Sequence, residues 1–308
     1  MILWGKTKDG KRRWRCKNCQ RSFVWEKQKS GHKKWLFFWL FNDTTTRIAD
    51  RIKVSKSTID REISLLLTHP PLNPIRPNEN VHLLIDGTYF KRTNCLVLYF
   101  DNDLKYFQLM RYTTREIKDE IIKDLRALKR SGVNVVSATA DGKNAVKSAL
   151  KKVFPAAEFQ RCLVHIQRYA ETYITKKPKT LAGKELKEII STLNCLDSHM
   201  ARMTFVARLN DWRRRHNDFL KEKTTKEDGS GWWYTHRNLR RVIYHIERAM
   251  PDMFRYLDNT SIPKDTNALE GRFTELKHKL ETHNGLRKTK RENYLKWYIY
   301  YKNLQEKG

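Results

Sequence analysis

Residues 81–90 have the sequence VHLLIDGTYF, an apolar run that contains one acidic residue, Asp86. Two similar runs follow, CLVLYF at 95–100 and KYFQLMRY at 105–112, with short polar segments between them. Short apolar runs that are bounded by turn residues are typical of buried strands. The three runs therefore predict an antiparallel meander with Asp86 inside its first strand.

Helical and strand patterns alternate beyond the meander. Residues 114–129 predict an amphipathic helix, whose apolar stripe consists of Ile117, Ile121, Leu125 and Leu128. Residues 134–141 (NVVSATAD) predict a strand, 142–153 a helix and 158–162 a last short strand. Three strands, a helix, a strand, a helix and a strand is the order of an α/β RNase H-like fold. We therefore expect a mixed five-stranded sheet as the catalytic core.

Three acidic residues stand where this framework can bring them together. Asp86 and Asp141 each end an apolar run, and Glu270 lies in TNALEGRFTELKHKL (266–280), which predicts a helix. Metal-dependent cleavage of a phosphodiester uses two cations roughly 4 Å apart. Mg²⁺ and Mn²⁺ prefer oxygen ligands such as carboxylates. The three residues are therefore candidate ligands for Mg²⁺ or Mn²⁺.

Each of these acidic residues has a purely structural alternative. Asp86 and Gly87 form a common turn pair, and Asp141 is a suitable N-cap for the following helix. Glu270 lies three residues after Asn267, which is the spacing of a variant capping box. The metal site is favoured only because the predicted strand order supports all three positions at once.

Residues 1–28 predict a small hairpin around the turn Lys8-Asp9-Gly10. It carries Cys16-x-x-Cys19, the spacing of one zinc knuckle and so half of a four-ligand ribbon. The other half would lie upstream, would have been lost, or would come from a partner. Two free thiols are the favoured alternative, so Zn²⁺ is a doubtful cofactor.

Residues 32–68 predict three helices, and the last two resemble a helix-turn-helix. Ser55 is a natural N-cap for the third helix. The residues that would then face DNA are Lys56, Ser57, Thr58 and Arg61. An ordinary helical hairpin is the alternative, but the basic context favours DNA binding.

The remaining chain divides by composition. Residues 69–80 (HPPLNPIRPNEN) contain four prolines and predict a linker. We assign 81–163 to the first part of the core, 164–262 to a helical insertion and 263–308 to C-terminal core helices that carry Glu270. Lys277 and Arg287 follow Glu270 and are candidate phosphate contacts, with a solvated charged face as the equal alternative.

The aromatic residues in the insertion have two possible roles, base stacking or packing in the core. GSGWWYTHRNLRR (229–241) sets Trp232, Trp233 and Tyr234 beside arginines, which suits stacking on unpaired bases. Large aromatic side chains are usually buried, so a place in the helical core is the favoured alternative. The same reasoning applies more strongly to Trp212.

The net charge favours a polyanionic partner. Lys and Arg total 63 against 34 for Asp and Glu, giving a formal charge of +29 over 308 residues. The longest aromatic-rich run, WLFFWLF at 35–41, is far shorter than the roughly 20 residues of a membrane span. An odd count of five cysteines and no apolar leader favour a reducing, intracellular setting. We expect a cytoplasmic protein without a membrane partner; a bacterial, nucleoid-associated protein is what the family resemblance of the segments quoted next implies.

Four segments carry a family resemblance: IDGTYF (85–90), ATADGKNAV (138–146), FQRCLVHIQR (159–168) and TNALEGRFTELKHKLETHNGLR (266–287). They resemble the DDE transposases of Mutator-like insertion sequences, in the bacterial variant with a zinc-binding N-terminus. The resemblance implies that Asp86, Asp141 and Glu270 are the metal-binding triad. Cys162 and His165 match the family's Cys-x-x-His signature, and their role stays open between structure and DNA contact.

The resemblance implies a transposase that binds terminal inverted repeats in double-stranded DNA, cuts at the transposon ends and joins them to target DNA. Two ends must be joined, so a homodimer or larger assembly on DNA is expected. One alternative is a catalytically inactive DNA-binding remnant of such an enzyme. The other is an RNase H-like structure-selective nuclease or resolvase.

Overall fold

The computed structural model describes residues 1–8, 10–24, 31–41, 43–90, 94–283 and 285–305. The chain forms two compact units: Met1–Pro70 with Lys279–Trp297, and Pro71–His278 with Tyr298–Gly308. Asp9 of the predicted turn, and residues 25–28 at the end of the predicted hairpin segment, lie outside the described residues. No helix within the described ranges is long and apolar enough to cross a membrane.

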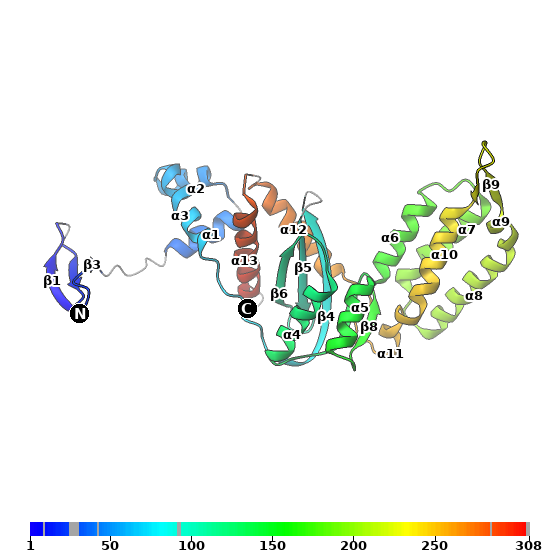
Figure 1. The fold of residues 1–308 in the computed structure, drawn as a ribbon, viewed down its shortest axis with the longest axis horizontal. Coiled ribbons are helices and arrows are strands. Elements are labelled where there is room, and N and C mark those ends of the chain that lie inside the picture. The colour runs from blue at the N-terminus through cyan, green and yellow to red at the C-terminus, as the bar shows by residue number, and fades with distance from the viewer. Residues whose placement is uncertain (9, 25–30, 42, 91–93, 284, 306–308) are drawn as a thin grey trace. The chain divides into compact units, whose positions relative to one another are not determined.

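A five-stranded sheet is the centre of the larger unit (Figure 1). Its strands are β4 (Asn78–Phe90), β5 (Asn94–Asp101), β6 (Tyr106–Thr113), β7 (Val133–Ala140) and β8 (Glu158–Arg161). The spatial order is β6-β5-β4-β7-β8; β4, β5 and β6 are antiparallel, and β7 and β8 run parallel to β4. This topology confirms the predicted mixed sheet of an RNase H-like fold.

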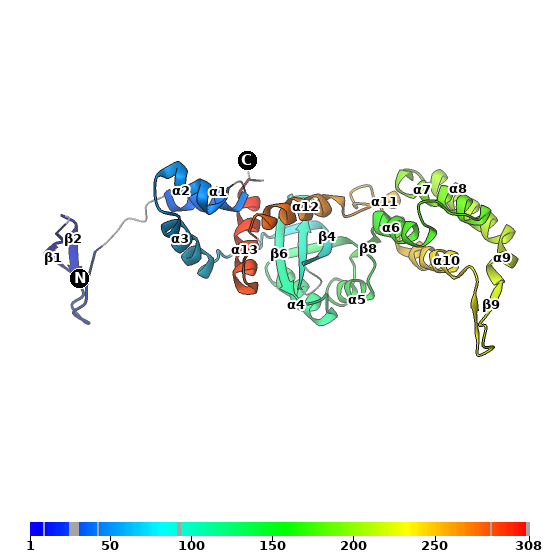
Figure 2. The same ribbon diagram turned by 90° about the horizontal axis from the view of Figure 1, so that it is seen from above.

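Alternation along the strands separates two buried faces. Val81, Leu83 and Ile85 belong to the core that also contains the apolar residues of α4 (Lys118–Arg130) and α5 (Asn144–Val153). Helix α12 (Asn267–Glu281) lies on the opposite side of the sheet (Figure 2). Because successive side chains on a strand point to opposite faces, Asp86 points toward the α12 side. The fold therefore aims this carboxylate at the helix that carries Glu270.

Two predicted boundaries differ from the structure. Strand β4 begins at Asn78, inside the segment 69–80 that was assigned to a linker. The rest of that segment has no regular structure, as its prolines require, but it is fixed to the sheet edge. Asn73 Nδ2 donates to the carbonyl of Phe107 at 2.8 Å, and Arg76 stacks on an aromatic ring of β6 at 4.2 Å.

Helix α4 begins at Lys118 and not at residue 114 as predicted. Residue Ile117 is its N-cap, without a side-chain hydrogen bond, and is 36% exposed. The residue before it, Glu116, is turned away from the helix and pairs with Lys143 at 2.8 Å. A tertiary ion pair therefore replaces the first predicted helical turn.

The segment after β8 is mainly helical, as expected for the insertion. Its elements are α6 (Leu163–Ile174), α7 (Leu181–Ser191), η1 (Leu193–Cys195), α8 (His199–Arg215), α9 (Asn217–Lys221), β9 (Lys223–Thr225), β10 (Trp232–Tyr234), α10 (Arg237–Ala249), η2 (Met250–Asp252) and α11 (Arg255–Asp258). The apolar residues of α6, α7, α8 and α10 form one buried cluster around Trp212. Trp212 is fully buried, which confirms its predicted place in the core.

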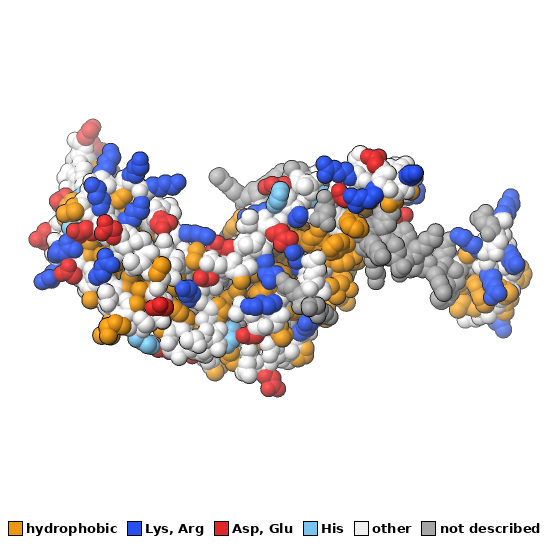
Figure 3. All heavy atoms as spheres, turned by 180° about the vertical axis from the view of Figure 1, so that it is seen from behind, with side chains coloured by type: hydrophobic (Ala, Val, Ile, Leu, Met, Phe, Trp, Pro, Cys, Tyr) orange, Lys and Arg blue, Asp and Glu red, His pale blue; other side chains and the backbone are white. Residues whose placement is uncertain are grey.

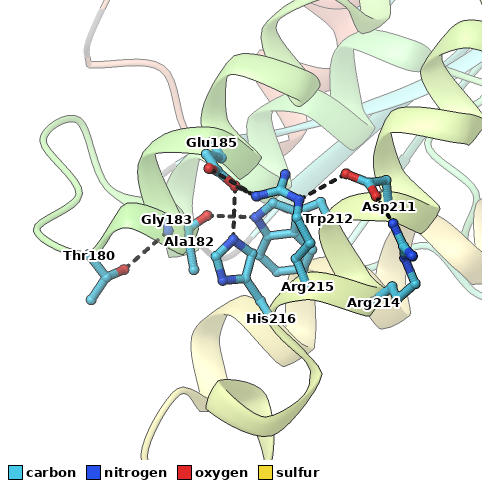
Figure 4. Close-up of polar contacts among 9 residues, drawn as sticks. All are labelled: Thr180, Ala182, Gly183, Glu185, Asp211, Trp212, Arg214, Arg215 and His216. Carbon is cyan, nitrogen blue, oxygen red and sulfur yellow. Dashed lines mark hydrogen bonds and ion pairs between the residues drawn. The ribbon is translucent and has the colours of Figure 1, made fainter.

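Polar contacts fix α7 against α8 above this tryptophan (Figure 4). Trp212 Nε1 donates to the carbonyl of Ala182 at 2.9 Å. Glu185 on α7 accepts hydrogen bonds at 2.8 Å each from Arg215, the last residue of α8, and from His216, which follows it. These contacts satisfy the buried indole donor and set how the two helices face each other.

The prediction that Trp232 and Trp233 are buried in helical core is wrong. Both lie in β10, which pairs with β9 in a two-stranded hairpin. Trp232 is 52% exposed and Trp233 40% exposed. Lys223 Nζ lies 3.8 Å from the Trp232 ring centroid, so the exposed indole is covered on one side by a cation.

The smaller unit contains a three-stranded sheet and four helices. They are β1 (Ile2–Lys6), β2 (Arg12–Arg15), β3 (Ser22–Val24), α1 (Gly31–Phe41), α2 (Thr45–Ile52), α3 (Lys56–Thr68) and α13 (Lys288–Gln305), which continues into the larger unit. Tyr294 Oη donates to the carbonyl of Leu40 at 2.8 Å, and Trp297 Nε1 donates to the carbonyl of Leu66 at 3.1 Å. The predicted C-terminal core segment 263–308 is thus divided between the two units.

One buried ion pair offers a test of the larger unit. Asp124 is 3% exposed and accepts hydrogen bonds from Tyr99 Oη at 2.9 Å and from the Arg111 guanidinium. We expect Asp124→Ala to lower the free energy of unfolding by about 2 to 4 kcal/mol, because two donors lose their acceptor in the core. Urea unfolding followed by circular dichroism measures this change.

The matched control is Asp119→Ala, which removes an exposed carboxylate from the first turn of the same helix. Its effect should stay within about 0.5 kcal/mol. Equal unfolding midpoints for the two variants would contradict the assigned role of Asp124.

Candidate active site

Asp86 lies in the middle of β4, where it pairs with Leu98 of β5, and is 9% exposed. Its Oδ1 accepts the backbone N–H of Gly87 at 2.8 Å. The prediction that Asp86 belongs to a strand is therefore confirmed, and the alternative of a simple turn is wrong. A carboxylate at this depth needs partners, because an unpaired buried charge is costly.

Asp141 follows β7 directly and is adjacent to Asp86. The parallel register pairs Leu84 with Thr139, so two residues further on Asp141 lies beside Asp86. Both oxygens of Asp141 are held by Lys143: Oδ1 accepts its backbone N–H at 3.0 Å, and Oδ2 pairs with its Nζ at 2.8 Å. The N-cap alternative is wrong, because Lys143 is the N-cap of α5 and the backbone N–H that Asp141 accepts is that of this capping residue.

Glu270 and His165 meet Asp86 at the α12 side of the sheet. One ligand atom from each of Asp86, His165 and Glu270 lies within 4.8 Å of the other two. Glu270 Oε2 pairs with Arg168 at 2.6 Å, and its Oε1 is buried without a hydrogen-bond partner among the described residues. Nδ1 of His165 is likewise buried and has no partner in the described part of the chain. Asp141 is not part of this group, so the structure joins two of the three predicted ligands and adds a histidine.

Cys162 ties the neighbouring elements together. It is fully buried, and its sulfur accepts the backbone N–H of Thr266 at 3.4 Å, just before α12. Its own N–H donates to the carbonyl of Ala140 at 2.7 Å, at the end of β7. Cys162 therefore fixes the start of α6, which bears His165, against the start of the helix that bears Glu270. Burial excludes direct contact between this thiol and DNA.

A fourth carboxylate, Glu116, stands beside Asp86. Its side chain is 6% exposed and pairs with Lys143 at 2.8 Å. A Cβ on Gly87 would lie 2.2 Å from Oε1 of Glu116, so only glycine leaves room for this approach. Glu116, Lys143 and Arg168 are not among the predicted site residues. Lys143 and Arg168 lie in two of the segments that carry the family resemblance, which was the available signal, whereas Glu116 lies in a charged segment without a motif.

Burial and like charges raise the pKa of Asp86 to about 7. Burial is the largest cause, and the carboxylates of Asp141, Glu116 and Glu270 add to it, while the Gly87 N–H opposes it. Burial lowers the pKa of Lys143, but its two carboxylate partners raise it above its ordinary value overall. The interaction with the Cys162 thiol raises the pKa of His165, against the effect of burial.

These residues fit a divalent cation. Two carboxylates and an imidazole form a donor set that Mg²⁺ or Mn²⁺ can use. Among the described residues, two of the donors have buried atoms without partners, and burial together with three nearby carboxylates raises the pKa of Asp86. A cation between Asp86, His165 and Glu270 would provide the missing partner and the missing charge.

The N-terminal cysteines show a different situation. Cys16 is half-buried and Cys19 exposed in the turn between β2 and β3. Hydrogen bonds from the backbone N–H groups of Cys19 and Asn18 lower the pKa of the Cys16 thiol. Within the described ranges, neither cysteine belongs to a cluster of three metal-ligating side chains.

Helices α2 and α3 are joined by a short turn in which Lys53 has a left-handed conformation, with φ of 59°. Ser55 Oγ accepts the N–H of Thr58 at 3.2 Å, which confirms the predicted N-cap. Among the predicted DNA contacts, Lys56, Ser57 and Arg61 are exposed, and Thr58 is half-buried. Lys56 also pairs with Asp60 at 2.6 Å, so its charge is partly balanced.

Two further predicted contacts lie in different units. Lys277 is half-buried on α12, two turns after Glu270, and Arg287 is exposed just before α13. In Figure 3, lysine and arginine side chains gather over the helical insertion, on the left of the view. The exposed basic surface therefore extends beyond the predicted residues.

Comparison with known proteins classifies the chain. A family model with the description "Transposase, Mutator family" matches residues 110–282, which is more than half of the sequence. No curated protein matches the chain. Among solved structures, the Drosophila P element transposase in its strand transfer complex is similar over 94% of this chain and 95% of that chain, with 13% identity and a TM-score of 0.44. A chain in the simian T-cell lymphotropic virus intasome, bound to the PP2A regulatory subunit B56 gamma, is similar over 54% and 69%, with 14% identity and a TM-score of 0.23.

Removal of the Asp86 charge tests the cation site. Because the pKa of Asp86 in the folded protein, about 7, lies above its ordinary 3.8, its ionised form opposes folding at pH 8. With chelator present, we expect Asp86→Asn to melt at a higher temperature than wild type at pH 8, and by a smaller margin at pH 5. Wild type should gain about 2.7 kcal/mol at a hundredfold excess of Mn²⁺ over its dissociation constant, and the variant should not respond.

Asp119→Asn is the control, since it changes one exposed carboxylate of the same unit. It should keep the Mn²⁺ response of the wild type. A full Mn²⁺ response in both Asp86→Asn and Glu270→Gln would show that the ion binds elsewhere.

Proposed function

Since the chain belongs to the Mutator family of transposases, we propose that it cuts and joins DNA at a metal centre built by Asp86, Asp141 and Glu270, with His165 beside them. The observation that carries this proposal is the convergence of Asp86, His165 and Glu270 within 4.8 Å. The unpartnered atoms of Glu270 and His165 support it.

When bound, one or two divalent ions would activate the attacking oxygen and stabilise the leaving oxygen of the phosphodiester. Asp86 and Glu270 would hold the ions through carboxylate oxygens, and His165 through its unpartnered Nδ1. Asp141 is held by Lys143 and would join them by exchanging that ion pair. Lys143 would keep its pair with Glu116 and could turn its remaining N–H groups to a phosphate.

Arg168 has a related role in the proposal. It pairs with Glu270 Oε2 at 2.6 Å and is otherwise well exposed, so its guanidinium lies at the mouth of the site. A guanidinium next to a scissile phosphate can bind two of its oxygens. Water would attack the phosphorus at the transposon end and release a 3′-hydroxyl, and this hydroxyl would attack a phosphodiester of target DNA. No side chain needs to act as the nucleophile.

Recognition of the transposon ends is assigned to the helix-turn-helix. The exposed Lys56, Ser57 and Arg61 at the start of α3 would face base edges and phosphates in the terminal inverted repeats. The net charge of +29 supports binding to both transposon and target DNA. Because two ends must be joined, we propose a homodimer or larger assembly on DNA.

The catalytic part is tested with a duplex oligonucleotide that carries one transposon end, in Mg²⁺ or Mn²⁺. Wild type should nick the end and join it to target DNA. Asp86→Asn and Glu270→Gln should lower both rates by roughly a hundredfold to a thousandfold and leave end binding intact.

Gel analysis of labelled strands separates nicking from joining. Binding without conversion by wild type would favour a catalytically inactive remnant. Equal cutting of branched DNA without a terminal repeat, and no joining, would favour a structure-selective nuclease.

End recognition is tested with Arg61→Ala. We expect it to raise the dissociation constant for the terminal repeat about tenfold and to reduce the preference over unrelated DNA, as the loss of one base or phosphate contact predicts. Fluorescence anisotropy at fixed salt measures both. Lys123→Ala is the matched control, because it removes one exposed positive charge from α4. A similar loss in the two variants would mean that Arg61 adds only net charge.

A further inference from the structure

A cavity of about 400 Å³ lies next to the active site, between the core and the helical insertion. Gly142 at the start of α5 is part of its wall, and this residue directly follows Asp141. Arg161 at the end of β8 also lines the cavity, and so do residues of α10. Its volume is within the range of roughly 300 to 1,000 Å³ that is typical of small-ligand sites.

Positive charge in this cavity is not balanced. Three arginines line it, Arg161, Arg241 and Arg248, and none of them has an ion pair with a carboxylate among the described residues. The one carboxylate in the lining, Asp252, is paired with Lys147. The cavity therefore offers guanidinium groups to an anion that enters it.

Arg161 is prepared for such an anion. Its Nε is buried and has no hydrogen-bond partner among the described residues. A Cβ on Gly142 would lie 2.3 Å from that Nε, so the glycine makes room for the guanidinium beside the loop that follows Asp141. Burial lowers the pKa of Arg161 and the charge of Arg248 adds to this effect, while the carboxylates of Asp141 and Asp252 oppose it. A phosphate would satisfy the orphaned donor and relieve the repulsion between the two arginines.

An aromatic surface stands beside the arginines. The rings of Tyr169 and His245 are stacked, with centroids 3.8 Å apart and an interplanar angle of 14°. Tyr244 lies on the rim and is 61% exposed. Burial, and after it the charges of Arg161 and Arg248, lower the pKa of His245 to about 4, so its ring is neutral and suits stacking. Phosphate-binding arginines next to a flat aromatic surface are the two features that a nucleotide needs.

Resting on the proposed function, we propose that this cavity binds one unpaired nucleotide of the DNA end, with its phosphate on Arg161 and Arg248 and its base against the stacked rings of Tyr169 and His245. Gly142 in the cavity wall directly follows Asp141, so a nucleotide bound here would keep the strand end beside the cleavage site. A free nucleotide shares this chemistry, and the test separates the two sources.

The test compares two DNA duplexes with the same terminal repeat, one blunt and one with three unpaired nucleotides at the cleaved end. Binding is measured by fluorescence anisotropy in chelator, which prevents cleavage. Wild type should bind the extended duplex about tenfold more tightly than the blunt one. Arg248→Gln and Arg161→Gln should reduce this ratio to about one and leave blunt-end binding nearly unchanged.

Arg214→Gln is the control, because it removes an exposed arginine of the insertion that is outside the cavity. It should keep the tenfold ratio. An extension without bases should recover only part of the gain, since the phosphates remain and the stacking is lost. Because Arg248 is exposed on the rim, its variant keeps the test valid if Arg161→Gln does not fold.

A second arm titrates free dAMP into the protein by calorimetry. Binding of dAMP that Arg248→Gln abolishes, without any gain from the DNA extension, would keep the nucleotide site but assign it to a free nucleotide. Equal binding of both duplexes and no dAMP binding would overturn the inference. If blunt ends are still bound, cut and joined in that case, the proposed transposase function stands without it.

Discussion

The carboxylate of Asp86 lies in the middle of a sheet, and three more carboxylates surround it. Burial of Asp86 and, after it, the repulsion from these carboxylates raise its pKa to about 7. Two basic side chains offset part of this negative charge. Lys143 forms ion pairs with Asp141 and Glu116, and Arg168 forms one with Glu270. The remaining imbalance is what a divalent cation would offset. Strand β4 is paired with β5 on one side and with β7 on the other, so the packed sheet keeps its backbone in place against this repulsion.

The position of His165 depends on the same scaffold. The insertion begins at α6, immediately after the last strand, and Cys162 at its start contacts both the end of β7 and the start of α12. Gln160 adds a second tie, since its Nε2 donates to the carbonyl of Met253 at 3.0 Å. The helical insertion is therefore anchored at the active site itself. A shift of the insertion would therefore act on His165 and Glu270 through these contacts.

The sheet could be predicted from the sequence because its signal is local. Buried strands such as 81–90 and 134–141 are continuous apolar runs between turn residues, and the order of elements leaves few topologies. The errors fall where tertiary contacts override local pattern. Helix α4 loses its first predicted turn to the pairing of Glu116 with Lys143. Trp232 and Trp233 were expected to be buried, but their hairpin is too short to give a strand signal.

The residues of the candidate site also fall into two groups: those that a local sequence pattern or motif marks, and those that only tertiary contacts bring to the site. Asp86 and Asp141 were found because each ends an apolar run, and Glu270 because its segment resembles a family motif. No periodicity marks Glu116 or Arg168, which reach the site from a loop and from a helix of the insertion. Their charges alone could not distinguish them from the many solvated lysines, arginines and acids of this chain.

Two glycines in the sequence do mark the places where side chains from other elements approach the aspartates. Both strand aspartates are followed by glycine, as Asp86-Gly87 and Asp141-Gly142. Such pairs are typical of turns, yet each glycine here makes room for a long side chain from elsewhere: Glu116 would lie 2.2 Å from a Cβ at Gly87, and Arg161 Nε 2.3 Å from one at Gly142. The first approach adds negative charge beside Asp86, and the second places a guanidinium in the wall of the cavity next to Asp141. The missing side chain next to each aspartate thus allows a charged group to approach it.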